Sequence, residues 1–206
     1  MAIAHEIKNP VAAARNVLHL LSHMSLTEEA NSLLTIAEEQ LNQIARIAEQ
    51  MLGLCRTPLP TETVNLRQVI DRAILAVTFA AANKRVRFAV EVSPELNVRA
   101  VDGELVQIFI NLLANAIHYS PEQGTVRIAA DCRNGHIAVR VSDNGPGVSA
   151  QNAPRLFQPF FTTNKTSGNG LGLWISRELA RRVGGDIRLS SSREGATFAL
   201  HLHPAA

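Results

Sequence analysis

Two kinds of hydrophobic pattern divide the chain near residue 58. Up to residue 57 the apolar residues recur at helical spacing, and the helix-breaking residues are limited to Pro10 and Gly53. A short break at residues 22–27 predicts two antiparallel helices joined by a turn. Apolar residues of the second helix recur at heptad spacing and form an a/d seam: Leu34, Ala37, Leu41, Ile44, Ala48, Met51 and Cys55. Two helices bury too little surface by themselves, so we expect the seam to pair with a second copy as a four-helix bundle.

The two predicted helices differ in length. The second covers about 29 residues and the first about 22, which at about 1.5 Å per residue leaves about 10 Å of the longer helix without a partner. We therefore expect that Met1 is a truncation point and that a longer protein precedes it.

After residue 57 the pattern changes to alternating helices and strands. Pro58 and Pro60 predict a linker at 58–65. Beyond it, helical periodicity predicts helices at 66–83, 105–119 and 171–183. Alternating and short apolar runs predict strands at 86–92, 97–101, 125–132, 136–143, 186–190 and 196–202, with a loop-like segment at 144–169. Strands interspersed with helices favour an α+β domain over 66–206, built as a two-layer sandwich.

Composition and charge exclude several classes of protein. The 206 residues carry 20 basic and 18 acidic side chains, a balance that excludes a polycationic nucleic-acid binder. The longest nearly apolar stretch, at 73–82, is about half of what a bilayer span needs, and no signal peptide opens the chain. Cys55 and Cys132 have no CxxC spacing, so they fit neither a zinc site nor a disulfide scaffold. These features predict a cytoplasmic chain.

The first candidate for chemistry is the run HEIKNP at residues 5–10. On a helix, His5 points away from the apolar stripe, with Asn9 on its own face and Glu6 beside it. This arrangement presents an imidazole together with a carboxylate and an amide. A solvated helix face would look similar, but Pro10 inside a helix costs about 3 kcal/mol, which a plain surface helix does not explain.

Two further groups of polar residues fall in the second half of the chain. Asn111 and Asn115 share one helix side with Gln107 and Tyr119, and amide oxygens suit Mg²⁺ together with water and phosphate. A polar solvent face is the alternative. Asp143 ends a predicted strand in the sequence DNGPG, which is either a turn or a carboxylate placed to accept a hydrogen bond from an exocyclic amine.

A glycine-rich run at 168–172 leads directly into a predicted helix. Free N–H groups and the helix dipole at such a junction favour a phosphate, although an ordinary loop is the alternative reading. Three aromatic residues precede this run within the long loop, and they predict a lid with an anchored end: Phe157, Phe160 and Phe161.

Taken together and in order, these runs resemble the H, N, first glycine, F and second glycine boxes of bacterial sensor histidine kinases of two-component systems. The runs are 5–10 (HEIKNP), 111–116 (NLLANA), 143–147 (DNGPG), 157–161 (FQPFF) and 168–173 (GNGLGL), and 195–198 (GATF) resembles the last glycine box. The resemblance implies a dimerisation and phosphotransfer hairpin at 1–57, a linker at 58–65 and an ATP-binding domain of the Bergerat (GHKL) type at 66–206. It implies ATP-dependent autophosphorylation of a histidine and phosphoryl transfer to an aspartate of a response regulator.

The resemblance also implies roles for individual residues. His5 would be the phosphoacceptor, Glu6 the base, and Asn9 a residue that positions water when the regulator is dephosphorylated. Mg²⁺ would be held by Asn115 with Asn111 nearby. The remaining residues would bind the nucleotide and shape its lid: His118, Tyr119, Asp143, Gly145, Gly147, Phe160, Thr162, Thr163, Lys165, Gly168, Gly170, Leu171, Gly172, Leu173 and Thr197.

Three positions depart from the usual pattern of these kinases. His118 stands where a lysine is common, Asn164 displaces a lysine to Lys165, and Asn169 stands where threonine is frequent. The partners implied are a second copy, a response regulator and an upstream sensory part, with membrane anchoring of the longer parent protein left open.

Three other classes of protein are weighed against this reading. ATPases of the gyrase type carry a glutamate four residues before the metal-binding asparagine, where this chain has Asn111. Anti-sigma-factor serine kinases have a similar nucleotide domain but no helical hairpin with an H box. A nucleotide-binding scaffold without phosphotransfer remains the third alternative.

Overall fold

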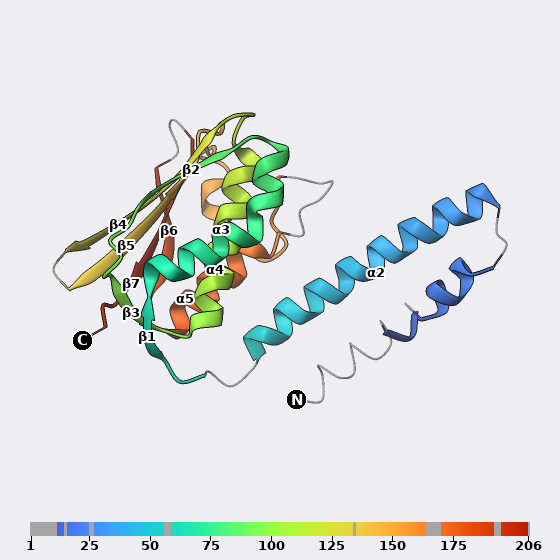
Figure 1. The fold of residues 1–206 in the computed structure, drawn as a ribbon, viewed down its shortest axis with the longest axis horizontal. Helices are drawn as coiled ribbons and strands as arrows, with labels where there is room; N and C mark the ends of the chain where they lie inside the picture. The colour runs from blue at the N-terminus through green and yellow to red at the C-terminus, as the bar shows by residue number, and fades with distance from the viewer. Residues whose placement is uncertain are drawn as a thin grey trace. The chain divides into compact units, whose positions relative to one another are not determined.

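The computed structural model describes residues 12–14, 16–24, 27–55, 59–133, 135–163, 170–191 and 195–205. The chain divides into two compact units, residues 1–57 and 58–206, which are described separately. Figure 1 shows the first unit as helical and the second as a sheet with helices against it. No helix within the described ranges is long and apolar enough to span a membrane.

The first unit contains the helical residues 16–22 and the long helix α2 (Glu28–Cys55). Thr27 begins α2 as its N-cap, because its Oγ1 accepts a hydrogen bond of 3.2 Å from the backbone N–H of Ala30. The 28 residues of α2 match the length expected from the sequence. Apolar side chains of this helix remain open to solvent, and Ile36 and Ile44 are 55% and 48% exposed. The pairing of the seam with a second copy stays a prediction.

The second unit is built around a five-stranded mixed sheet in the order β2-β4-β5-β7-β6. Strand β2 runs parallel to β4, and the other neighbours are antiparallel. A separate two-stranded sheet joins β1 to β3. The strands are β1 (Glu62–Asn65), β2 (Arg87–Glu91), β3 (Asn97–Ala100), β4 (Thr125–Arg133), β5 (His136–Ser142), β6 (Asp186–Ser191) and β7 (Thr197–Leu202).

Three helices cover one face of the five-stranded sheet (Figure 1). They are α3 (Leu66–Asn83), α4 (Asp102–Tyr119) and α5 (Gly172–Arg182), with a short 3₁₀ helix, η1 (Ala153–Arg155), in the connection before α5. The core lies between the two layers, where Phe109 of α4 and Ile128 of β4 are fully buried. The two-layer α/β sandwich expected from the sequence is therefore confirmed.

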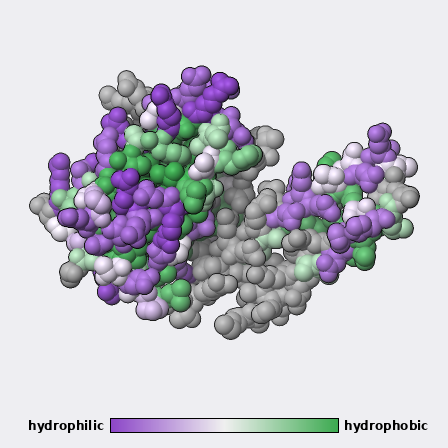
Figure 2. All heavy atoms as spheres, viewed as in Figure 1, coloured by the Kyte–Doolittle hydropathy of each residue, from purple (hydrophilic) through white to green (hydrophobic). Residues whose placement is uncertain are grey.

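Apolar side chains also reach the surface of the second unit. Leu75 and Phe79 of α3 are 75% and 79% exposed. Figure 2 shows hydrophobic surface bordered by hydrophilic residues on the visible face of this unit.

The linker expected at 58–65 is wrong in its second half. Residues 62–65 form strand β1, whose Val64 is 5% exposed and lies opposite the fully buried Val98 of β3. A strand of four residues with one buried side chain leaves too little alternation to be seen in the sequence. The segment expected as a loop at 144–169 contains η1, and α4 begins at Asp102 rather than at residue 105.

Candidate functional site

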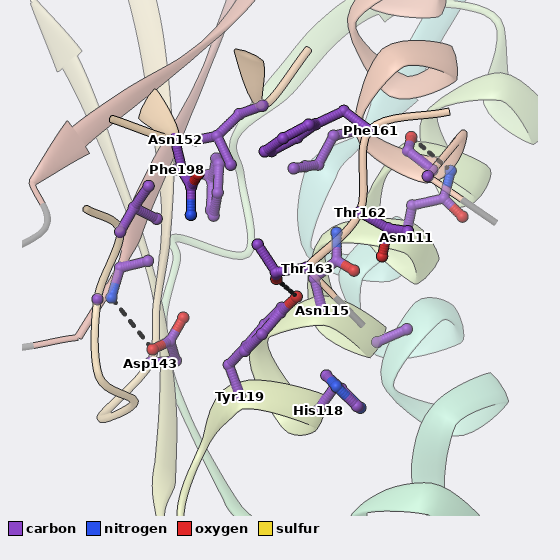
Figure 3. Close-up of a pocket in the computed structure, with 18 of the residues that line it drawn as sticks. Asn111, Asn115, His118, Tyr119, Asp143, Asn152, Phe161, Thr162, Thr163 and Phe198 are labelled. Carbon is purple, nitrogen blue, oxygen red and sulfur yellow. Dashed lines mark hydrogen bonds between the residues drawn. The ribbon is translucent and has the colours of Figure 1, made fainter. Parts of the chain in front are cut away.

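A pocket of about 350 Å³ opens between α4, the start of α5 and the ends of β5 and β7 (Figure 3). Eleven of the predicted site residues line it: Asn111, Asn115, His118, Tyr119, Asp143, Gly147, Thr162, Thr163, Gly170, Gly172 and Leu173. These residues come from motifs that lie as far as 62 positions apart in the chain, as Asn111 and Leu173 do. The fold thus brings the N box and the first and second glycine boxes to one cavity.

The buried carboxylate of Asp143 lies at one side of the pocket, directly after β5. Its side chain is 7% exposed, and its Oδ1 accepts hydrogen bonds from the backbone N–H groups of Gly145 at 2.8 Å and Ala196 at 3.1 Å. Figure 3 shows the other carboxylate oxygen directed toward the pocket. Two backbone donors therefore fix the orientation of the carboxylate, and the second oxygen is available to accept a hydrogen bond from a ligand.

Glycines allow the backbone to approach Asp143 closely. At Gly195, where φ is +85°, a Cβ atom would lie 1.8 Å from the carbonyl oxygen of Asp143. At Gly145 a Cβ would lie 2.5 Å from the carbonyl oxygen of Tyr119. Side chains at these two positions would push the loops away from the carboxylate, which explains why glycines surround it in the sequence.

The two asparagines of α4 have different surroundings. The Oδ1 of Asn111 accepts from Gln107 Nε2 at 3.0 Å, and its Nδ2 donates to the carbonyl of Gly172 at 3.2 Å and to Ser176 Oγ at 3.1 Å. Asn111 therefore joins α4 to the first turn of α5. Asn115 lines the pocket one turn later, and its side-chain amide has no hydrogen bond to any described residue. Its oxygen is available to a ligand or cation.

Side chains at the end of α4 make a hydrogen bond and a ring contact at the mouth of the pocket. The Tyr119 hydroxyl and the Thr163 hydroxyl are 2.7 Å apart and share a hydrogen bond, drawn in Figure 3. The His118 ring packs edge-on against Tyr119, with the ring centroids 4.8 Å apart. Lys84 Nζ donates to the carbonyls of Ile117 and His118 at 3.2 and 2.5 Å, which places a positive charge at the negative end of the helix.

Two of the three aromatic residues before the glycine run pack against other side chains. The Phe157 ring lies edge-on to Phe198 with centroids 6.3 Å apart, and the guanidinium of Arg155 lies 4.5 Å above the ring of Phe161. Phe161 and Phe198 both line the pocket. Phe160, in contrast, is 62% exposed with φ of +63° and does not line the pocket.

The other predicted residues fall into two groups. Gly145, Phe160, Leu171 and Thr197 are described but do not line the pocket; Leu171 is fully buried, and Thr197 Oγ1 donates to Ser142 Oγ at 2.9 Å. His5, Glu6, Asn9, Lys165 and Gly168 lie outside the described residues.

Sequence reasoning missed several lining residues: Ala114, Val148, Ser149, Asn152, Leu156, Phe161, Ala196 and Phe198. Four of them lie inside quoted motifs, which could have indicated them: Ala114, Phe161, Ala196 and Phe198. Ser149 and Asn152 belong to a turn in which the Asn152 N–H meets the carbonyl and the Oγ of Ser149 at 3.0 and 3.3 Å. The sequence of this turn carries no motif.

A metal site made of acidic and sulfur ligands is not present in the described ranges. These residues contain no group of three or more His, Cys, Asp or Glu side chains that could hold a metal ion. A divalent cation in this pocket would therefore depend on amide oxygens, water and the oxygens of a bound phosphate, the ligand set that Mg²⁺ accepts.

Comparison with known proteins places the chain in a family. Residues 1–59 match the His Kinase A (phospho-acceptor) domain family, and residues 100–206 match the family of histidine kinase-, DNA gyrase B- and HSP90-like ATPases. The sensor histidine kinase ZraS of Klebsiella oxytoca is 29% identical over 205 residues, which cover 97% of this chain and 44% of that protein. The signal transduction histidine-protein kinase AtoS of Escherichia coli (strain K12) is 31% identical, over 97% of this chain and 33% of that protein.

Solved structures agree with these sequence matches. Full-length ShkA, crystallised with AMPPNP, superposes with a TM-score of 0.81 at 27% identity, over 100% of this chain and 46% of that chain. The catalytic domain of the histidine kinase ThkA superposes with a TM-score of 0.65 at 26% identity, over 70% of this chain and 96% of that chain. The chain thus spans less than half the length of the curated relatives named above. With both domain families matched in order, it belongs to the bacterial two-component sensor histidine kinases.

Proposed function

We propose that this chain binds ATP in the pocket beside Asp143, transfers the γ-phosphoryl group to His5, and passes it to an aspartate of a response regulator. The single observation that carries the proposal is the Asp143 carboxylate, which two backbone N–H groups orient toward the pocket. A carboxylate oxygen held in this way accepts a hydrogen bond from the exocyclic amine of adenine. The placement of Asn115, Gly170 and Gly172 in the same pocket supports a triphosphate beside the base.

Magnesium fits the part of the pocket formed by α4. Asn115 would hold the ion, since its amide has no partner among the described residues, whereas the amide of Asn111 is bonded to Gln107, Gly172 and Ser176. We propose that Asn111 contributes by fixing the start of α5 beside Asn115. When bound, the ion would neutralise charge on the phosphates.

The proposed reaction uses three residues of the first unit. A nitrogen of the His5 imidazole attacks the γ-phosphorus of ATP, so that an N–P bond forms, the bond to the bridging oxygen breaks and ADP leaves. Glu6 accepts the proton from the imidazole. The phosphoryl group then passes from His5 to a carboxylate of the regulator, and Asn9 orients the water that later hydrolyses the acyl phosphate.

The proposed assembly is a homodimer. The exposed seam residue Ile44 of α2 supports it, because pairing with a second hairpin would remove this side chain from water. Sedimentation at several concentrations measures this dimerisation directly.

Incubation with γ-labelled ATP tests the proposed function. Label on the protein that is lost in acid and retained in base indicates phosphohistidine, and His5→Gln should abolish it. His23→Gln is the matched control, because His23 is an exposed histidine of the same unit. Nucleotide binding without label would identify a scaffold, and label retained in His5→Gln would refute the assignment of the acceptor.

A further inference from the structure

Arg177 contacts both strand β6 and the loop before α5, two segments that no single motif contains. It lies on α5, and its Nε and Nη2 donate to the two carboxylate oxygens of Asp186 on β6 at 2.7 and 3.2 Å. The same guanidinium lies 4.7 Å from the centroid of the Phe157 ring. The Arg177 and Asp186 side chains are 27% and 22% exposed, so this contact is partly shielded from water.

The contacts continue from Phe157 to the wall of the pocket. The Phe157 ring meets Phe198 of β7 edge-on, at an interplanar angle of 86°. Phe198 is 7% exposed and lines the pocket on the same side as Asp143, as Figure 3 shows. An unbroken series of contacts therefore leads from the carboxylate of Asp186 to a ring that lines the pocket.

The chemistry of arginine suits this double contact. A planar guanidinium can bind a carboxylate through two parallel hydrogen bonds and stack on an aromatic face at the same time, whereas the ammonium of lysine cannot do both. The hydrogen bond with Arg177 also holds the pKa of Asp186 far below its usual range, so the pair stays charged at all working pH values.

We propose that Arg177 is a positioning residue for nucleotide binding: by holding Phe157 against Phe198, it fixes the wall of the pocket on the side of the base. Arg177 does not line the pocket and acts only through the two rings. This inference rests on the proposed binding of ATP, and it adds a residue of α5 that lies outside the glycine box.

The test compares ATP affinity and autophosphorylation in Arg177→Lys with those in a matched control, Arg188→Met. Arg188 also contacts Asp186, at 3.1 Å, but its side chain is 69% exposed and contacts no ring in the described structure. The fluorescence of Trp174, the single tryptophan of the chain, reports binding from the same helix. We expect Arg177→Lys to raise the Kd for ATP about three- to tenfold, which lies between the values for an exposed and a desolvated cation–π contact. The rate at saturating ATP should stay within about twofold. Arg188→Met should leave the Kd unchanged.

A double-mutant cycle separates positioning from general stability. Arg177→Met and Phe157→Leu should be strongly non-additive in ATP affinity, because each breaks the same series of contacts. Additive losses, or an unchanged Kd in Arg177→Lys, would overturn the inference while the wild-type chain still binds ATP. Failure of the wild-type chain to bind ATP would instead refute the proposed function.

Discussion

Replacing Asp143 by asparagine changes one atom of the pocket wall. The asparagine Oδ1 can still accept from the N–H groups of Gly145 and Ala196, at the positions where Asp143 Oδ1 accepts them at 2.8 and 3.1 Å. The amide nitrogen then replaces the oxygen that faces the pocket. In the flipped orientation the amide nitrogen would face the two backbone donors, so that orientation is disfavoured. A bound adenine amine would therefore meet a donor instead of an acceptor.

The size of the effect follows from this geometry. Loss of a hydrogen bond to a charged group costs about 1.5–3 kcal/mol, which corresponds to about a 10- to 100-fold increase in the Kd for ATP. The fold should be nearly unaffected, because both backbone donors keep their acceptor. Asp143→Ala, in contrast, removes the acceptor of two N–H groups and should lower the free energy of unfolding by about 1–3 kcal/mol for each.

Calorimetric titration with ATP and with inosine triphosphate provides the measurement. Inosine carries a carbonyl oxygen where adenine carries its amine, so the wild type should prefer ATP and Asp143→Asn should reduce that preference. Asp131→Asn is the matched control, since Asp131 is a half-exposed carboxylate on β4 that pairs with Arg140 and does not line the pocket. An unchanged ATP affinity in Asp143→Asn, or an equal loss in the control, would refute the role given to this carboxylate.

Three further predictions concern other parts of the chain. Arginine partners hold the pKa of Asp186 far below its usual range. The ionised carboxylate therefore stabilises the fold fully above about pH 4, and this stabilisation is lost as the pH falls through the folded pKa. The difference in melting temperature between the wild type and Asp186→Asn should shrink below pH ~4, and a constant difference would contradict this. Gly195→Ala, at φ +85° and with its Cβ 1.8 Å from a backbone oxygen, should lower the free energy of unfolding by more than about 1 kcal/mol in urea, whereas Gly103→Ala, with open space, should not. Glu6→Gln should slow autophosphorylation by about 10²–10⁴, while Asn9→Ala should spare it and impair dephosphorylation of the regulator; equal effects on both reactions would show that these residues only maintain the helix.

Local pattern predicts most helices and strands of the second unit, because each of them buries one face. Helix α3 occupies Leu66–Asn83, as its periodicity predicts. The start of α4 at Asp102 precedes its first buried residue, Leu105, and only the acidic residues Asp102 and Glu104 in the first turn could have indicated it. The parallel pairing of β2 with β4 is a contact between distant segments, and no local period encodes it.

The residues of the candidate site also differ in how far the local sequence can predict them. Asparagine is a poor helix former, so Asn115 is unusual in its helix, whereas the DNGPG run of Asp143 is also an ordinary turn sequence. The order of the motifs along the chain is what indicates both residues. The hydrogen bonds of Asn111 to Gly172 and Ser176 join residues 61 and 65 positions apart in the sequence. They give a structural role to an asparagine that the sequence suggests as a metal ligand. The contact of Arg177 with Phe157 has no local signal, because an arginine on an exposed helix face is common.

Helix α4 shows how one element serves both the core and the pocket. Its buried side packs against the sheet, with Phe109 and Leu113 fully buried. Its polar side makes hydrogen bonds to described residues on either side of 164–169, from Tyr119 to Thr163 and from Asn111 to Gly172. Because the buried side fixes the position of the helix, the polar side can be changed without loss of the core. A substitution at Asn115, which has no hydrogen bond to a described residue, should therefore alter nucleotide binding at nearly constant stability. A substitution at Asn111 should also lower stability, because it breaks the bonds to Gly172 and Ser176.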